Sequence, residues 1–151
     1  MQAKSPRTRI VGIDYGMARL GLAISDETKL IATPMPTLEA HKKIEFTVTK
    51  LLEQLDKHQK EFGYQVEEIV VGLPLMMSGK FGMLADEVKH FVDILRTLVP
   101  FPVTTWDERL TTVQAERALR ESHLSRKRRA KNVDSVAALI ILQNYLDHKR
   151  I

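Results

Sequence analysis

The chain contains no cysteine, which excludes disulfide bonds and thiolate metal sites and fits a reducing compartment. It also lacks any apolar run near the roughly 18 residues of a membrane span. Its first nine residues are basic, but they are not followed by the long apolar core of a secretory signal. We therefore expect a cytoplasmic protein that does not interact with membranes.

The remaining composition is that of a globular protein, with 44% hydrophobic and 28% charged residues in a chain of 151. This length is typical of one domain with a single core, so we expect one domain over residues 1–151, with residues 1–8 flexible. A net charge of +4 permits attraction to polyanions but is weak evidence by itself. The function must therefore be sought in motifs.

The first third of the sequence predicts three strands and a helix. Residues 9–14 and 20–25 form apolar runs on either side of a turn at Gly16, which is typical of a hairpin. A third strand is predicted at 30–34, where Pro34 and Pro36 mark its end or an edge of the sheet. Apolar residues then recur at helical spacing over 42–62, and Gly63 ends that helix.

The rest of the chain alternates strands with helices. Strands are predicted at 68–74 and 103–106, with a helix from Ala85 to Val99 between them. Thr111 and Gln114 fit a capping box, which predicts a helix after Thr111. A final helix is predicted at about 132–148. The residues predicted to face inward in this helix are Val136, Ala137, Ile140, Ile141 and Tyr145.

The predicted order is β-β-β-α-β-α-β-α, an α/β fold in which a three-strand meander is extended through helical crossovers into a mixed sheet. This order is typical of a ribonuclease H-like domain. A doubly wound dinucleotide-binding fold is the alternative, but its glycine-rich loop leads from the first strand into a helix. Here Gly12, Gly16 and Gly21 lie in the predicted hairpin, which disfavours that alternative.

Acidic residues occur at three predicted element ends. Asp14 ends the first strand, Asp107 and Glu108 follow the last strand, and Asp134 opens the final helix. Taken singly, each has an ordinary structural explanation: a turn residue, a residue ahead of a helix, or a first-turn partner of the helix dipole. Taken together, they occupy ends that this topology brings to one edge of the sheet, where carboxylates could share a metal ion.

A basic segment directly precedes the third acidic position. It is either a solvated loop or an element that binds phosphates beside the acidic residues. Its position next to Asp134 favours the second interpretation. Its cations are Arg126, Lys127, Arg128, Arg129 and Lys131.

The motifs also resemble a known family in their order along nearly the whole chain. The most specific is Trp106-Asp-Glu-Arg-Leu-Thr-Thr112 followed by Asp134-Ser-Val-Ala-Ala138, whereas Ile10-Val-Gly-Ile-Asp-Tyr-Gly16 is less specific. Together with Arg19-Leu-Gly-Leu-Ala-Ile-Ser-Asp26 and Val70-Val-Gly-Leu-Pro-Leu75, they are similar to the signatures of the YqgF/RuvX family. The resemblance implies a ribonuclease H-like nuclease that processes the 5′ end of pre-16S rRNA or resolves Holliday junctions.

The resemblance and the residues together imply two-metal hydrolysis of a phosphodiester. Mg²⁺ is the expected ion and Mn²⁺ an alternative, because hard cations prefer carboxylate and water ligands. We expect Asp14, Asp107 and Asp134 to bind the metal ions, with Glu108 as a further catalytic candidate. Because side chains alternate along a strand, only one of Asp107 and Glu108 can face the metals if the strand continues that far.

Several cations outside the basic segment are further candidates for phosphate contacts. Arg19 and Arg109 follow the first two acidic motifs, although Arg109 could instead pair with Asp107 or Glu108 and hold the loop. The chain departs from the family pattern at Met17 and in the loop at 76–81, where Lys80 could take over a phosphate contact.

Three classes of function remain open from the sequence. A nuclease acting on structured RNA is favoured. A junction-resolving DNase would need two active sites and hence a homodimer, while the first class could act as a monomer. A non-catalytic nucleic-acid binding module would bind in a salt-dependent way without cleavage. A sugar kinase of the actin type, suggested by Gly-Ile-Asp14-Tyr-Gly, would need a second similar domain that 151 residues cannot provide.

Overall fold

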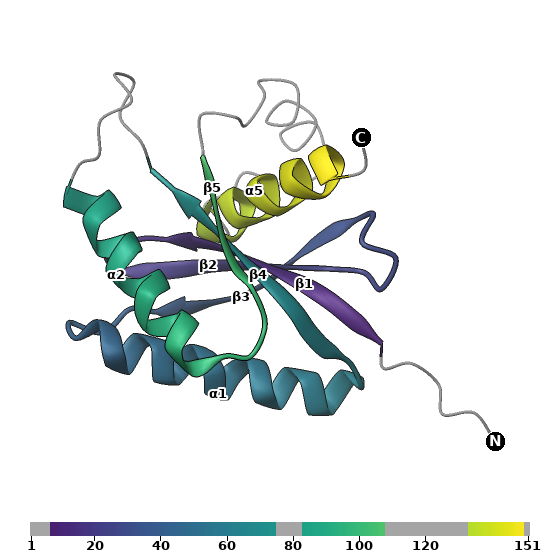
Figure 1. The fold of residues 1–151 in the computed structure, drawn as a ribbon, viewed down its shortest axis with the longest axis horizontal. Helices are drawn as coiled ribbons and strands as arrows, with labels where there is room; N and C mark the ends of the chain where they lie inside the picture. The colour runs from purple at the N-terminus through teal and green to yellow at the C-terminus, as the bar shows by residue number, and fades with distance from the viewer. Residues whose placement is uncertain (1–6, 75–82, 108–132, 150–151) are drawn as a thin grey trace.

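The computed structural model describes residues 7–74, 83–107 and 133–149 (Figure 1). Its elements follow the predicted order of strands and helices. The strands are β1 (Thr8–Tyr15), β2 (Arg19–Ser25), β3 (Ala32–Glu39), β4 (Gln65–Leu73) and β5 (Val103–Asp107). The helices are α1 (Ile44–Phe62), α2 (Met83–Leu98) and α5 (Val133–Lys149).

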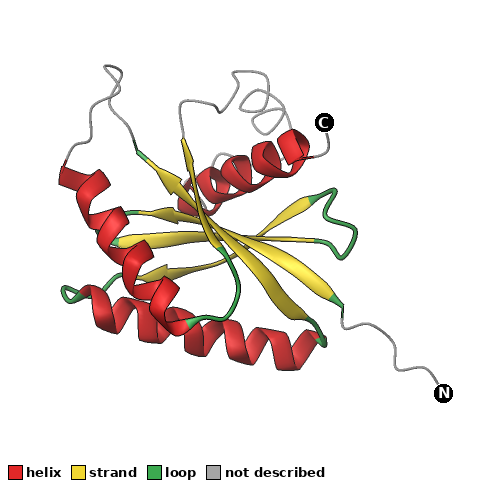
Figure 2. Cartoon of the chain, in the orientation of Figure 1, coloured by secondary structure: helices red, strands yellow, loops and turns green. Residues whose placement is uncertain are grey.

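The five strands form one mixed sheet in the order β3-β2-β1-β4-β5. The pairs β1–β2 and β2–β3 are antiparallel, whereas β1–β4 and β4–β5 are parallel. Helices α1 and α2 cover one face of this sheet and α5 covers the other (Figure 2). The predicted meander and helical crossovers are therefore confirmed, and the carboxyl ends of β1, β4 and β5 lie at the same edge.

The core between the sheet and α1 and α2 follows the predicted helical spacing. Leu51 of α1 and Phe91 of α2 are completely buried against the strands, as are Val48 and Val88. The left-handed residue Gly63 (φ 68°) ends α1, and its backbone N–H donates to the carbonyl oxygen of Gln59 at 2.9 Å. The predicted end of this helix is confirmed.

The inward face of α5 differs from the prediction. Of the residues expected to face inward, Ile141 is buried and Tyr145 packs against the same core cluster, whereas Val136, Ala137 and Ile140 are half-buried and are not part of it. The face that packs on the sheet is made instead by Ala138, Leu139, Ile141, Leu142 and Leu146. Residues 136–142 are apolar without interruption, so their periodicity does not single out one face of the helix.

The third strand also lies later than predicted. Leu30 and Ile31 belong to the preceding turn, where their backbone N–H groups donate to the Asp26 carboxylate at 2.8 and 3.0 Å. Pro34 and Pro36 lie within β3, which continues to Glu39. They are tolerated because β3 is an edge strand, where a missing backbone donor costs little.

The first strand begins inside the segment that was expected to be flexible. β1 starts at Thr8, and the carbonyl oxygen of Arg7 accepts a hydrogen bond of 2.8 Å from the backbone N–H of Gln65. Residues 1–6, and the helix predicted after Thr111, lie outside the described residues.

Helix α5 approaches β1 very closely at Gly12. A Cβ atom at this position would lie 2.7 Å from Cβ of Leu142 and 3.3 Å from the carbonyl oxygen of Ala138. Only a residue without a side chain permits this approach. Next to Leu142, the Gln143 side chain accepts a hydrogen bond of 2.9 Å from the backbone N–H of Ala32 and donates one of 2.9 Å to the carbonyl oxygen of Leu30. The position of α5 over the sheet is therefore fixed on two strands.

Replacing Gly12 should test this packing. We expect Gly12→Ala to lower the free energy of unfolding by about 1–3 kcal/mol, because the new methyl group forces α5 away from β1. Urea denaturation followed by circular dichroism measures the change. Gly63→Asn is the control, since Asn tolerates the left-handed conformation and nothing lies within 4 Å of a Cβ there. Equal stability of Gly12→Ala and the wild type would contradict the close approach.

Candidate active site

Asp14 is half-buried near the carboxyl end of β1 and lies on the face of the sheet that α5 covers. Its neighbours Ile13 and Tyr15 are buried in the core on the opposite face, so strand alternation turns Asp14 toward α5. On β2, Asp14 is paired with Gly21. On β4, Ile13 is paired with Val71, so the same register places Gly72 beside Asp14. Both flanking strands therefore carry a glycine, not a larger residue, at the level of Asp14.

The start of α5 lies near the same place. Its residues Ala138 and Leu142 lie over Gly12, two positions before Asp14, while Lys149 reaches Glu68 farther back along the sheet. The helix therefore begins toward the carboxyl end of β1 (Figure 1). Asp134 is four residues before Ala138 and hence on the same row of the helix. Its backbone is part of α5, but its side chain lies outside the described part of the structure.

Asp107 reaches the same edge of the sheet but on the other face. Thr104 and Trp106 contact Glu68 and Tyr145 on the α5 side. Thr105, between them, lines a small cavity with Val92 and Asp93 of α2. Asp107 is paired with Leu73, which packs against the α1/α2 core. Alternation along β5 thus assigns Asp107 to the α2 side, opposite Asp14.

The remaining predicted site residues are divided between described and undescribed parts of the chain. Arg19 is exposed at the start of β2, next to the β1–β2 turn and at the same edge as Asp14. Among residues 7–74, 83–107 and 133–149, no group of three His, Asp or Glu side chains is arranged to hold a metal ion. The predicted residues outside these ranges are Lys80, Glu108, Arg109, Arg126, Lys127, Arg128, Arg129 and Lys131.

A buried carboxylate behind the candidate site was missed from the sequence. Glu68 of β4 is 7% exposed and accepts hydrogen bonds from Tyr145 Oη at 2.6 Å and Thr104 Oγ1 at 2.7 Å. Lys149 Nζ lies 3.1 Å from its other oxygen. Glu68 thereby joins β4, β5 and α5. Its position directly before the apolar run Ile69-Val70-Val71 was the available signal, because a charge beside a central strand needs partners when it is buried.

The ionisation of Glu68 depends on these partners. Burial raises the pKa of its carboxyl group, but the hydrogen bonds from Tyr145, Thr104 and Lys149 outweigh burial and hold the pKa below its ordinary value. A carboxylate with a lowered folded-state pKa stabilises the fold above its unfolded pKa. That contribution is lost as the pH falls through the folded-state pKa.

Glu68→Gln should therefore destabilise the protein in a pH-dependent way. We expect the free energy of unfolding at pH 7 to fall by about 1–3 kcal/mol, because the charge-assisted hydrogen bonds are lost. The difference from the wild type should shrink below pH 4.5, the ordinary pKa of the group. Urea denaturation at several pH values measures it. A difference that stays constant down to pH 3 would show that Glu68 does not stabilise the fold as a carboxylate.

Known proteins resemble this chain over nearly its whole length. A family model described as "RuvX: Holliday junction resolvase" matches residues 8–148. A protein of Protochlamydia amoebophila named "Putative pre-16S rRNA nuclease" is 58% identical over 149 residues, which cover 99% of each chain. A protein of Halothermothrix orenii with the same name is 43% identical over 141 residues, covering 93% of this chain and 96% of the relative.

Solved structures share the fold at low sequence identity. Thermus thermophilus RuvC in complex with a Holliday junction substrate superposes with a TM-score of 0.56 at 17% identity, covering 95% of each chain. The fowlpox virus Holliday junction resolvase has a TM-score of 0.54 at 12% identity, covering 93% of this chain and 99% of the viral chain. These similarities confirm the ribonuclease H-like fold. No helix in the described residues is long and apolar enough to cross a membrane.

Proposed function

The chain belongs to the RuvX family and is a hydrolase of phosphodiester bonds, and we propose that it is a metal-dependent nuclease that processes the 5′ end of pre-16S rRNA. The observation that carries this proposal is the setting of Asp14. It is a half-buried carboxylate between glycines at the carboxyl end of β1, and the row of α5 that bears Asp134 begins beside it. The end of β1 and the start of α5, which are far apart in sequence, thus lie toward the same edge of the sheet, and this supports a site shared by Asp14 and Asp134.

The donor atoms at this place suit a hard divalent cation. Asp14 and Asp134 supply carboxylate oxygens, and the chain has no cysteine that would favour a softer metal. Mg²⁺, with Mn²⁺ as an alternative, fits such a set. When bound, these ions supply Lewis acidity toward the phosphate and lower the pKa of water. The role of the protein is to hold the carboxylates at fixed positions, while the glycines beside Asp14 leave room for the phosphodiester.

The third carboxylate is assigned to Glu108 rather than to Asp107. Asp107 occupies the α2 side of β5, whereas Asp14 occupies the α5 side. In an extended chain the next residue turns to the opposite face, and Glu108 is next in sequence. Glu108 itself lies outside the described residues. Asp107 takes part in an interaction within the fold, and its proposed role is to stabilise the end of β5.

Single substitutions separate these two roles. Glu108→Gln should lower the rate of cleavage at least about 100-fold, because an anionic metal ligand is lost. Asp107→Asn should leave a rate within about tenfold of the wild type, as expected of a residue outside the metal shell. Single-turnover cleavage of an end-labelled RNA at saturating Mg²⁺ measures both. The reverse ranking would restore Asp107 as the ligand.

The basic residues are proposed to bind the phosphate backbone around the cleavage site. Arg19 is exposed at the edge where Asp14 lies. Lys80, Arg109 and the cations of 126–131 surround the acidic motifs in sequence. Cations of this kind position the nucleic acid without reading its sequence, so binding should weaken with increasing salt.

A Holliday junction resolvase is the second candidate function. It is favoured by the description of the family model, and one solved structure of the same fold contains a junction substrate. Paired nicks across a junction require two active sites at a fixed separation, which one chain does not supply. The proposal for RNA follows instead from the names of relatives that span nearly the whole chain.

The central test uses Asp14→Asn. We expect the wild type with Mg²⁺ or Mn²⁺ to cleave an end-labelled pre-16S 5′ segment, and we expect chelation or Asp14→Asn to abolish cleavage, since either removes the metal site. Matched single strands and a four-way DNA junction are assayed in parallel. Circular dichroism of the variant confirms that the fold is retained.

The substrate panel separates the candidates. Metal-dependent cleavage of the RNA alone supports rRNA processing, whereas symmetric nicking of the junction by a dimer supports the resolvase. Undiminished activity in Asp14→Asn would remove this residue from the site. Salt-dependent binding without cleavage under any metal would contradict the nuclease and favour a binding module.

A further inference from the structure

We propose that Phe46 and His41, at the start of α1, form a stacking platform for an unpaired base in a single-stranded segment of the nucleic-acid substrate. The platform is defined by these two rings and by the flanking cations Lys42 and Lys43. This inference rests on the proposed function, because it extends the path of the nucleic acid away from Asp14. It assigns base stacking to the surface at the start of α1, a role that neither the acidic residues nor the basic segment has.

The platform consists of an exposed ring that other groups hold in place. Phe46 is 51% exposed although it is a large apolar residue. The His41 ring meets it edge-on with centroids 5.0 Å apart, and Lys43 Nζ lies 5.9 Å from the Phe46 centroid. An aromatic face beside cations is the arrangement that binds bases and phosphates of single strands together.

Hydrogen bonds hold the backbone before α1, beside the platform. The Oγ1 atom of Thr47, a completely buried residue, accepts a hydrogen bond of 2.8 Å from the backbone N–H of His41. The His41 ring in turn accepts from the backbone N–H of Lys43 through Nδ1 at 3.1 Å. The His41 ring beside Phe46 is thereby held in place, so less conformational freedom is lost when a base binds against the two rings, which favours binding.

The platform lies at the same edge of the sheet as Asp14. The backbone N–H of Ala40 donates to the carbonyl oxygen of Ala18, at 2.9 Å, and so joins the loop before α1 to the β1–β2 turn. This turn begins at Gly16, two residues after Asp14, and its residue Met17 is 77% exposed. Because α1 covers the opposite face of the sheet from α5, a nucleic-acid strand held at Asp14 would have to cross the sheet edge over this turn to reach Phe46.

The charges around the platform suit a polyanion. Lys42 and Lys43 are exposed, and Arg19 lies at the end of the same turn. The nearest carboxylate on α1, that of Glu45, lies 3.9 Å from Nε2 of His90 on α2, which offsets its charge when His90 is protonated. Phosphates on either side of a stacked base would find these lysines within reach of their flexible side chains.

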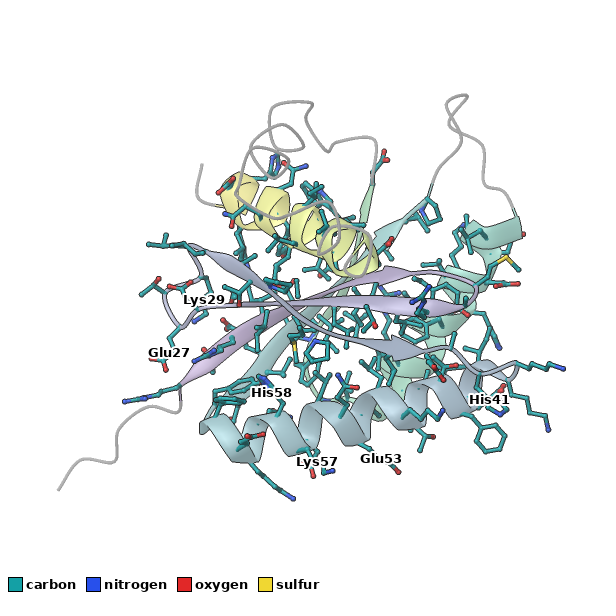
Figure 3. The ribbon with its side chains drawn as sticks, turned by 180° about the vertical axis from the view of Figure 1, so that it is seen from behind. Glu27, Lys29, His41, Glu53, Lys57 and His58 are labelled. Atoms are coloured by element: carbon teal, nitrogen blue, oxygen red, sulfur yellow. The ribbon has the colours of Figure 1, made fainter. Side chains whose placement is uncertain are left out.

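The opposite end of α1 provides a matched control. Phe62 is 54% exposed and stacks on His58 with ring centroids 4.5 Å apart, so it resembles Phe46 in exposure and in its histidine neighbour. His41 and His58 lie at opposite ends of the helix (Figure 3). The two phenylalanines are about 24 Å apart along the helix axis, and only Phe46 lies at the edge of Asp14.

The test measures binding separately from cleavage. In the Asp14→Asn background with Mg²⁺, anisotropy titrations use fluorescein-labelled 12-nucleotide single-stranded RNA, the same sequence as DNA, and a blunt RNA duplex. Phe46→Ala, Phe62→Ala and Phe46→Trp are added in turn, and circular dichroism verifies folding. The chain has one natural tryptophan, so the emission added by Phe46→Trp is obtained by subtraction.

We expect Phe46→Ala to weaken binding of both single strands by about 5- to 100-fold, the range for loss of one stacked base. Phe62→Ala should change these affinities by less than about twofold. Phe46→Trp should retain affinity, and its added emission should be quenched by the single strands. Duplex binding should be the same with and without Phe46.

Two results would overturn the platform: unchanged single-strand affinity in Phe46→Ala, or an equal loss in Phe46→Ala and Phe62→Ala. An effect as large on the duplex as on the single strands would also overturn it, because paired bases are not available for stacking. A wild type that cleaves no substrate but binds single strands through Phe46 would refute the proposed nuclease and leave the platform standing.

Discussion

The contact of Gly12 with α5 determines how closely this helix packs on the sheet. Because β1 has no side chain at this position, α5 lies so close that a Cβ would be 2.7 Å from Leu142. The helix start is thereby brought toward the end of the strand that bears Asp14. Displacement of α5 would move the start of the helix relative to the end of β1, so packing in the core and the arrangement of elements at this edge depend on the same residue.

A second, polar contact holds the other half of the helix. Glu68 is buried between β4, β5 and α5 and is stabilised as a carboxylate by Tyr145, Thr104 and Lys149. An apolar contact such as that at Gly12 is nearly independent of pH, whereas this one is not. The two anchors lie at different levels of β1, since Glu68 is paired with Ile10. Together they fix the orientation of α5 as well as its distance from the sheet.

The order of elements and the faces of α1 and α2 were predictable, because apolar residues there recur with a clear helical period. The face of α5 was not, because its uninterrupted apolar run fits several faces, and the choice came from Gly12 on a distant strand. The acidic positions at element ends were also predictable. The faces of Asp14 and Asp107 became distinguishable only through strand register and the contacts of Thr104 and Trp106.

The prolines of β3 bear on how copies of this chain could associate. Pro34 and Pro36 each remove a backbone donor from the strand at one margin of the sheet. An added strand would find too few partners there, so this margin is a poor template for sheet extension and for the aggregation that begins with it. Two copies of this chain would therefore not be expected to pair through their β3 strands, which leaves β5 as the other edge of the sheet.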